Sequence, residues 1–372
     1  MRRSCVLVLI VFVVAPNLLW AGSTGRWSPE RARAWYAKQP WPVGSNFVPS
    51  TAINELEMWQ ADTFDLPTID RELGWAESLG MNSMRVFLHN LLWVQDSKGF
   101  LVRMERFLEV ADKHHIRITF VLLDSVWDPY PKIGKQREPR PHVHNSGWVQ
   151  APGAEMLRDR SRWNDLKGYV VGVVGHFRSD HRILLWDLMN EPDNDNPAYQ
   201  AVELPNKEGV ALQLLRQEWT WARSARPSQP LTSGVWRGNW SADANLSEIQ
   251  RFQLENSDVI TFHSYEPPDV LKQRIDSLRQ FHRPILCTEY MARPLGSTFA
   301  ANLPLLKEAN VAAYNWGFVS GKSQTIYPWD SWEKVYSAEP AVWFHDIFRQ
   351  NGEPYDPKEV LLIRQLTKRT PS

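Results

Sequence analysis

The sequence predicts an α/β fold, a single (β/α)8 or TIM barrel with an additional N-terminal helix and long loops after its strands. Three observations support this. The chain has 372 residues, which fits one barrel with extended loops. Short runs rich in β-branched residues alternate with longer amphipathic stretches, as parallel strands joined by helical crossovers do. Polar side chains follow several of these apolar runs, where the carboxyl end of a barrel strand is expected.

The alternation can be followed along the whole chain. The predicted strands are residues 43–47, 83–88, 117–123, 183–189, 230–235, 259–263, 285–289 and 311–318. The predicted helices between them are residues 67–79, 101–115, 163–177, 208–225, 270–281 and 299–310, with a shorter crossover at 246–255. Ser28 followed by Pro29 predicts one more helix before the first strand, which we expect to close the barrel floor.

The N-terminal segment resembles a secretory signal peptide. Two arginines follow Met1, an apolar stretch comes next, and small residues occupy positions 21–23. We therefore expect a signal peptide at residues 1–22, one domain at 23–372, and a secreted or periplasmic protein. An uncleaved membrane anchor is the alternative, because the apolar stretch approaches the length of a span, although Pro16 and Asn17 interrupt it. Without the peptide, Cys287 is the one remaining cysteine, and we expect it to be a buried apolar residue.

The composition favours an uncharged partner. Lys plus Arg and Asp plus Glu both number 42 and no long run of one sign occurs, which argues against nucleic acid or an anionic membrane. Trp is unusually frequent, with 19 residues against 15 Phe and 10 Tyr. Indole rings offer flat platforms for the C–H faces of sugars, although packing explains about half of them. The loop tryptophans that we consider as platforms are Trp59, Trp93, Trp127, Trp148, Trp236, Trp240 and Trp329.

Two carboxylates follow predicted strands that face each other across the barrel. Glu191 lies in Asn190-Glu191-Pro192 after the fourth strand, and Glu289 lies in Thr288-Glu289-Tyr290 after the seventh. Hydrolysis of a glycoside with retention needs two carboxyl groups about 5 Å apart, one protonated and one ionised. The alternative is a pair of structural ion-pair partners at the barrel rim.

The neighbouring residues suggest how the two carboxyl groups divide the work. Arg85 on the second strand and Tyr265 after the sixth are donors that would keep Glu289 ionised as the nucleophile. Glu191 would then hold the proton as acid/base. We expect Asn190 to bind the sugar 2-hydroxyl. Trp316, at the end of the eighth strand, would form the floor under the reacting sugar.

Together these motifs resemble glycoside hydrolase family five and its clan of retaining barrels. The resemblance covers roughly residues 41–318 and includes Arg85, Asn190, Glu191, His263, Tyr265, Glu289 and Trp316 in the family's order. It implies catalysis by Glu191 and Glu289 and substrate binding by the other five. The expected substrate is a β-linked oligo- or polysaccharide of the cellulose, mannan or other β-glucan type. We expect the enzyme to be a monomer and to use no metal or organic cofactor.

One position departs from that family pattern. Many members have histidine after the third strand, where this chain has Asp124. His89, or His142 and His144 in the long loop at residues 125–153, are candidates for that space. His142 and His144 also resemble the His-x-His of metal-dependent barrel hydrolases.

Two other functions fit the same motifs. The chain could be a carbohydrate-binding barrel that has lost catalysis, or a transglycosylase that uses the same site. The sugar, and endo or exo action, stay open, because specificity depends on loop geometry. The loops after the third and eighth strands are expected to shape the cleft, and either could close one end of it.

Overall fold

The computed structural model describes residues 25–368 and confirms the barrel. The parallel strands are β1 (Val43–Asn46), β2 (Ser83–Phe87), β3 (Arg117–Asp124), β4 (Ile183–Asn190), β5 (Leu231–Thr232), β6 (Ile260–His263), β7 (Ile285–Tyr290) and β8 (Ala312–Asn315). Their order in the sheet is β5-β4-β3-β2-β1-β8-β7-β6. A parallel bridge between Val235 and Phe262 joins the two edges and closes the barrel. The predicted segment 230–235 forms only the two-residue β5, because the chain leaves the sheet before it pairs again at Val235.

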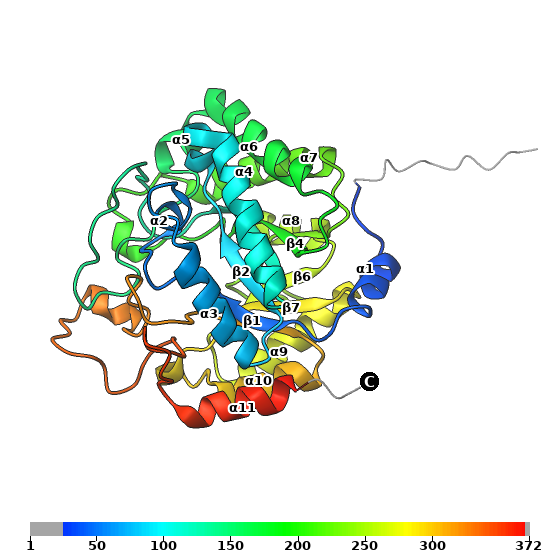
Figure 1. Cartoon of the computed structure of the whole chain (residues 1–372). Coiled ribbons are helices and arrows are strands. Elements are labelled where there is room, and N and C mark those ends of the chain that lie inside the picture. Colours follow the sequence, from blue (N-terminus) through cyan, green and yellow to red (C-terminus); the bar gives the residue numbers. More distant parts are fainter. Residues whose placement is uncertain (1–24, 369–372) are drawn as a thin grey trace, which may run out of the picture.

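Helices surround the barrel (Figure 1). The helices at or near predicted positions are α3 (Leu66–Ser78), α4 (Asn90–Lys113), α6 (Trp163–His176), α7 (Lys207–Ser224), α8 (Glu248–Asn256), α9 (Pro268–Leu278) and α10 (Phe299–Glu308). Additional helices are α2 (Glu55–Trp59), α5 (Ala154–Arg158) and α11 (Pro357–Thr367). Short 3-10 turns are η1 (Arg160–Arg162), η2 (Pro197–Tyr199), η3 (Arg279–Phe281), η4 (Arg293–Leu295) and η5 (Trp329–Trp332). Helix α4 starts earlier than predicted and continues across a kink at Asp96.

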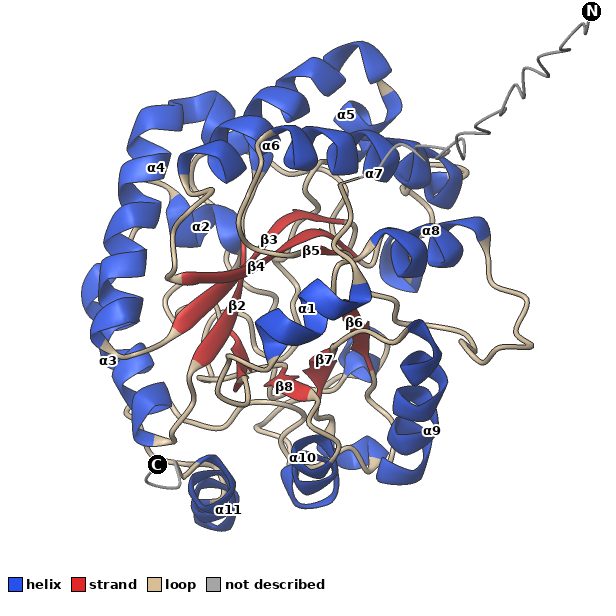
Figure 2. Cartoon of the chain, turned by 90° about the vertical axis from the view of Figure 1, so that its right-hand side faces the viewer, coloured by secondary structure: helices blue, strands red, loops and turns tan. Residues whose placement is uncertain are grey.

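The predicted N-terminal helix, α1 (Pro29–Tyr36), does close the barrel floor. The Ser28 hydroxyl caps it by accepting a hydrogen bond from the amide of Arg31. Figure 2 looks at the end of the barrel that α1 crosses. Ala32 and Tyr36 are buried there in one apolar cluster with strand residues such as Leu185 and Leu286. The opposite end, where the strands finish, is therefore the open mouth.

Two long loops shape this mouth. Residues 125–153 follow β3, and residues 316–356 follow β8. The loops after β6 and β7 are much shorter, at residues 264–267 and 291–298. Within residues 25–368, no helix has the length and apolar character needed to cross a membrane. The predicted signal peptide and Cys5 lie outside the described residues.

Candidate active site

Arg85 lies at the centre of the barrel mouth and organises the residues around it. It is fully buried on β2, and its guanidinium donates to four side chains from three other strands. Nη1 donates to Glu289 Oε1 and to Asn46 Oδ1, each at 2.8 Å. Nη2 donates to Asn190 Oδ1 and Asp187 Oδ2, also at 2.8 Å each. One cation therefore fixes the orientation of β1, β4 and β7 side chains at once.

Glu191 and Glu289 face each other, as the strand positions predicted. One carboxylate oxygen from each, together with an imidazole nitrogen of His263, lie within 4.8 Å of one another. His263 Nδ1 is 2.7 Å from Glu191 Oε1 and 3.6 Å from Glu289 Oε2. The backbone of Glu191 has a φ of 40°, in the left-handed region that strains an L residue. Such strain is typical of functional sites, and here it follows directly from the sharp exit of β4 before Pro192.

The two carboxyl groups have different partners. Glu289 accepts hydrogen bonds from Arg85 and from the Tyr265 hydroxyl, at 2.8 and 2.7 Å. Glu191 Oε2 accepts a hydrogen bond from Asn194 Nδ2 at 2.7 Å and has no guanidinium in contact. The Arg85 guanidinium and the Tyr265 hydroxyl favour the charged form of Glu289, and the acid/base role of Glu191 stays a prediction.

Burial shifts the pKa of both carboxyl groups in the same direction. Burial raises the pKa of Glu191 to about 7, against a smaller lowering by the Asn194 hydrogen bond. Burial also raises the pKa of Glu289, and the positive charge of Arg85 opposes that rise. Burial lowers the pKa of His263 to about 4, so its imidazole is neutral at ordinary pH. A neutral imidazole leaves Arg85 as the cation that balances Glu289.

The β3 end is filled by an aspartate in a polar network. Asp124 is buried, and its Oδ1 accepts a hydrogen bond from Asn190 Nδ2 at 3.0 Å. Its Oδ2 accepts a hydrogen bond from the Trp148 indole at 2.7 Å. The Asn190 side chain is thus held from both sides: its oxygen accepts a hydrogen bond from Arg85, and its nitrogen donates one to Asp124. Of the three histidines considered for this space, only His144 reaches the pocket wall.

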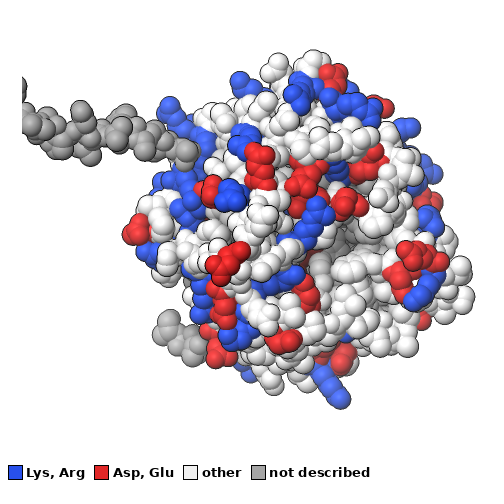
Figure 3. All heavy atoms as spheres, turned by 180° about the vertical axis from the view of Figure 1, so that it is seen from behind, with Lys and Arg blue, Asp and Glu red and all other residues white. Residues whose placement is uncertain are grey.

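A pocket of about 750 Å³ lies above these groups. Asn190, Glu191, Tyr265, Glu289 and Trp316 line it. Arg85 and His263 are buried beneath the residues that line the pocket. They therefore act on a bound molecule by orienting the two carboxyl groups and Asn190. Lys, Arg, Asp and Glu side chains are intermixed on the surface seen in Figure 3, with wide uncharged areas between them and a hollow in that face.

Tryptophans provide much of the pocket wall. Those in the lining are Trp127, Trp148, Trp236, Trp316, Trp329 and Trp332. Trp329 is the most exposed of them, at 39%, and its ring meets the Tyr265 ring edge-on at 5.1 Å. Trp59 and Trp240 are fully buried, and Trp93 packs against Gly172 and the ring of Tyr169. These last three tryptophans therefore pack loops and helices, which was the alternative interpretation.

Solved structures share this barrel. No protein-family model matches the chain, and no curated protein matches it in sequence. A GH5_18 variant from Streptomyces cattleya in complex with Manβ1-4GlcNAc matches with TM-score 0.59 and 11% identity, over 89% of this chain and 82% of that one. The endo-β-1,4-mannanase from Thermotoga petrophila matches with TM-score 0.57 and 15% identity, over 90% and 77%. The exo-β-1,4-mannosidase from Opitutaceae bacterium strain TAV5 matches with TM-score 0.56 and 19% identity, over 88% and 59%. The chain therefore has the fold of glycoside hydrolase family five enzymes.

The described residues contain one group with the spacing of metal ligands, namely Glu191, His263 and Glu289. Arg85 already neutralises Glu289, and His263 Nδ1 is engaged with Glu191. A cation at this point would compete with the guanidinium, so these residues fit acid/base chemistry better. The Nδ1 atoms of His142 and His144 instead donate to backbone carbonyls of the β8 loop. The expectation of no metal and no cofactor stays a prediction.

Several site residues were not predicted from the sequence. Asp187 is a charged residue inside the apolar run of β4, and that contrast was a usable signal for a partner of Arg85. Asn46 and Asp124 are the last residues of β1 and β3, positions like those of the predicted site residues. Asn194 and Trp332 come from irregular loops, where the sequence pattern gives no position.

Proposed function

We propose that this protein is a retaining β-glycoside hydrolase of the family-five type. The observation that carries the proposal is the pair Glu191 and Glu289, whose oxygens approach within 4.8 Å across the barrel mouth in different electrostatic surroundings. Retaining enzymes hold these groups about 5–5.5 Å apart, whereas inverting enzymes need about 6.5–9.5 Å to admit a water. The short span therefore favours direct attack by a carboxylate.

In the first step, Glu289 attacks the anomeric carbon of the sugar. An oxygen of Glu289 forms the ester bond while the bond from the anomeric carbon to the leaving oxygen breaks. Glu191 transfers its proton to that leaving oxygen. Arg85 and Tyr265 keep Glu289 ionised and oriented for attack.

Water completes the reaction in the second step. It adds its oxygen to the anomeric carbon and gives a proton to Glu191, and the bond to Glu289 breaks. Both carboxyl groups return to their starting states, and the configuration at the sugar is kept. Asn190 lies next to the acid, and a hydrogen bond from it to the 2-hydroxyl would strengthen as charge develops at the neighbouring carbon.

A β-1,4-mannoside is the substrate we propose. The three structures above include a mannanase, a mannosidase and a complex with Manβ1-4GlcNAc. The tryptophan walls of the pocket suit an uncharged sugar chain. The signal-peptide pattern supports a secreted or periplasmic enzyme, and we propose a monomer.

The assignment is tested with aryl β-mannosides and β-1,4-mannooligosaccharides, with glucosides and xylosides for comparison. Glu289→Gln should lower kcat/KM at least about 10³-fold, since the nucleophile is lost. A 2-fluoro sugar with a good leaving group should label Glu289 in the wild-type protein, as located by peptide mass spectrometry. Glu248→Gln, an exposed change on α8, is the matched control and should leave activity unchanged.

Two results would contradict this proposal. Label on any residue other than Glu289 would remove the assigned nucleophile. Sugar binding without turnover on the whole panel would instead favour a carbohydrate-binding barrel. Products larger than the substrate would indicate transglycosylation through the same two carboxyl groups.

A further inference from the structure

The long loops after β3 and β8 are joined to each other above the barrel mouth. We define the clasp as residues 140–145 of the β3 loop and residues 323–336 of the β8 loop. The amide nitrogens of His142 and His144 donate to Gln324 Oε1 and Ser331 Oγ at 2.7 and 3.0 Å. Their Nδ1 atoms donate to the carbonyls of Tyr336 and Tyr327 at 2.6 and 2.8 Å.

Four more hydrogen bonds join the two loops within the clasp. The Gln324 amide group donates to the carbonyls of Arg140 and Val143 at 2.7 and 3.3 Å. The backbone amide of Asn145 donates to the backbone carbonyl of Ser323 at 2.8 Å. The Trp332 indole donates to the His144 carbonyl at 2.8 Å. The two loops therefore form one connected wall.

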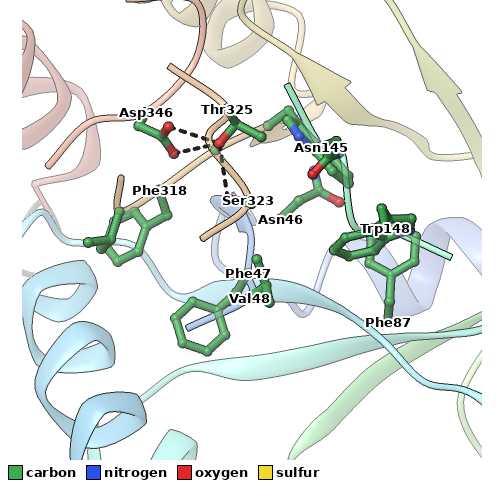
Figure 4. A pocket seen from close by; sticks show the side chains of 13 residues that line it. Asn46, Phe47, Val48, Phe87, Asn145, Trp148, Phe318, Ser323, Thr325 and Asp346 are labelled. Atoms are coloured by element: carbon green, nitrogen blue, oxygen red, sulfur yellow. Dashed lines mark hydrogen bonds between the residues drawn. The ribbon is translucent and has the colours of Figure 1, made fainter. Parts of the chain in front are cut away.

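This wall covers the ends of β1 and β2, because these strands lie between β8 and β3 in the sheet. Beneath it only a cavity of about 20 Å³ is left, enough for a single water. Figure 4 shows the side chains that fill the space, including Asn46 from β1, Phe87 from β2, and Asn145, Ser323 and Thr325 from the clasp. Thr325 is fixed by hydrogen bonds to Asp346. Protein side chains therefore fill this sector beneath the wall.

The wall continues to the loop after β4. The Trp332 ring stacks on Trp127 at 5.4 Å and meets the Tyr199 ring at 5.5 Å. Arg137 of the β3 loop donates to the Tyr199 hydroxyl at 3.0 Å. The wall thus runs from β8 over β1, β2 and β3 to β4, and the short loops lie on the other side, after β6 and β7.

The acid/base fixes the direction in which a sugar chain must lie. Glu191 gives its proton to the leaving oxygen, so the leaving group lies on its side, beside Asn194 and Trp236. The sugar that Glu289 attacks then lies toward Trp148, Trp316 and the wall. The pocket of about 750 Å³ is in the range of sites that enclose a small ligand, about 300–1,000 Å³.

From this geometry we propose that the site is a blind pocket for the non-reducing end of a β-1,4-mannan chain. The enzyme removes units from that end and does not cut inside the chain. This inference rests on the proposed function, and it adds the position of the cut. The clasp is the part of the chain that determines the position of the cut.

The test uses β-1,4-mannohexaose that carries a fluorescent label at its reducing end. With the wild-type protein, the labelled product should shorten stepwise from the non-reducing end during the first turnovers, without early labelled fragments of one or two units. Early labelled fragments of mixed length would overturn the blind pocket and leave the proposed hydrolase intact. Failure to hydrolyse either the hexaose or aryl β-mannosides would remove the proposed function, and this inference with it.

A clasp variant tests whether the clasp prevents cuts inside the sugar chain. Gln324 has a φ of 55°, which asparagine also tolerates, so Gln324→Asn keeps the backbone while its shorter side chain loses the cross-loop bonds. Combined with Ser331→Ala, it should raise the share of internal cuts about tenfold. Hydrolysis of aryl β-mannosides verifies that the variant is folded. Gln280→Ala, on the far side of the barrel, is the control, and an unchanged product pattern in an active clasp variant would show that the clasp does not set the cut.

Discussion

At the scale of single residues, Asn194 contacts Glu191, the proposed acid/base. Its amide nitrogen donates to Glu191 Oε2 at 2.7 Å, and this bond stabilises the charged form. Burial raises the pKa of Glu191 to about 7, so this carboxyl group, the proposed acid, loses its proton as the pH rises through that value. The basic limb of the activity profile is therefore expected near pH 7.

Asn194→Ala should move that basic limb upward by about one pH unit, because a hydrogen bond to a charged group is lost. The measurement is kcat/KM against pH, with an aryl β-mannoside whose leaving group is poor and needs the proton. Asn351→Ala, a surface change far from the pocket, should leave the profile in place. A basic limb that stays fixed or moves down in Asn194→Ala would contradict this role.

The predicted site residues were found because each lies on a strand near its carboxyl end or shortly after it. In a closed parallel barrel, all strand ends meet at one mouth, so sequence positions 204 apart, as in Arg85 and Glu289, come into contact. That rule does not extend to loops. Asn194 and Trp332 depend on how residues 191–206 and 316–356 fold, and no periodicity in the sequence encodes this.

At the scale of elements, α7 carries a buried carboxyl group without a partner. Glu218 is fully buried, and neither of its oxygens has a hydrogen-bond partner among the described residues. Burial raises its pKa well above the usual value. The folded chain then keeps a proton that the unfolded chain releases, so the free energy of unfolding falls as the pH rises above about 4.5.

Glu218→Gln should remove this dependence. We expect it to stabilise the protein at pH 7 by roughly 1.4 kcal/mol or more, the value of one pKa unit, and to have little effect near pH 4. Denaturant unfolding at both pH values measures it, and Glu208→Gln on the same helix is the control. Equal changes at both pH values would show that Glu218 is not protonated in the folded state.

Most elements were predictable to within a few residues because their apolar residues follow one period. Those that were missed carry a weak pattern. Helices α2 and α5 have five residues each, which is too short for a helical stripe to be recognised. Helix α11 buries only Val360 and Ile363. The early start of α4 was missed because the kink at Asp96 interrupts its period.

At the scale of the whole molecule, the reactivity of the Cys287 thiol can be used to follow unfolding and to test for signal-peptide cleavage. It is fully buried in β7, and burial raises the pKa of its thiol. A thiol that is buried and protonated does not react with Ellman's reagent. The native protein should therefore show no reactive thiol within residues 25–368.

Thiol counting in guanidinium chloride tests the signal-peptide prediction. The full chain contains two cysteines, Cys5 and Cys287, and cleavage after residue 22 removes the first. The secreted protein should expose one reactive thiol on unfolding, whereas the cytoplasmic precursor should expose two. Two thiols in the exported protein would show that the N-terminal segment is retained, as an anchor would be.

The helix that closes the floor also has a consequence for the order in which the chain folds. The backbone carbonyl of Ser257 accepts a hydrogen bond from Arg26 across 231 positions, and that of Asn310 accepts one from Tyr36 across 274. Contacts this distant in sequence close late, because the chain between them must first be ordered. On the ribosome, α1 is made before every strand of the barrel, and its apolar partners on β4, β7 and β8 follow later. Its apolar face and the preceding Trp27 therefore stay uncovered until these strands are made, and we expect a chaperone to bind there.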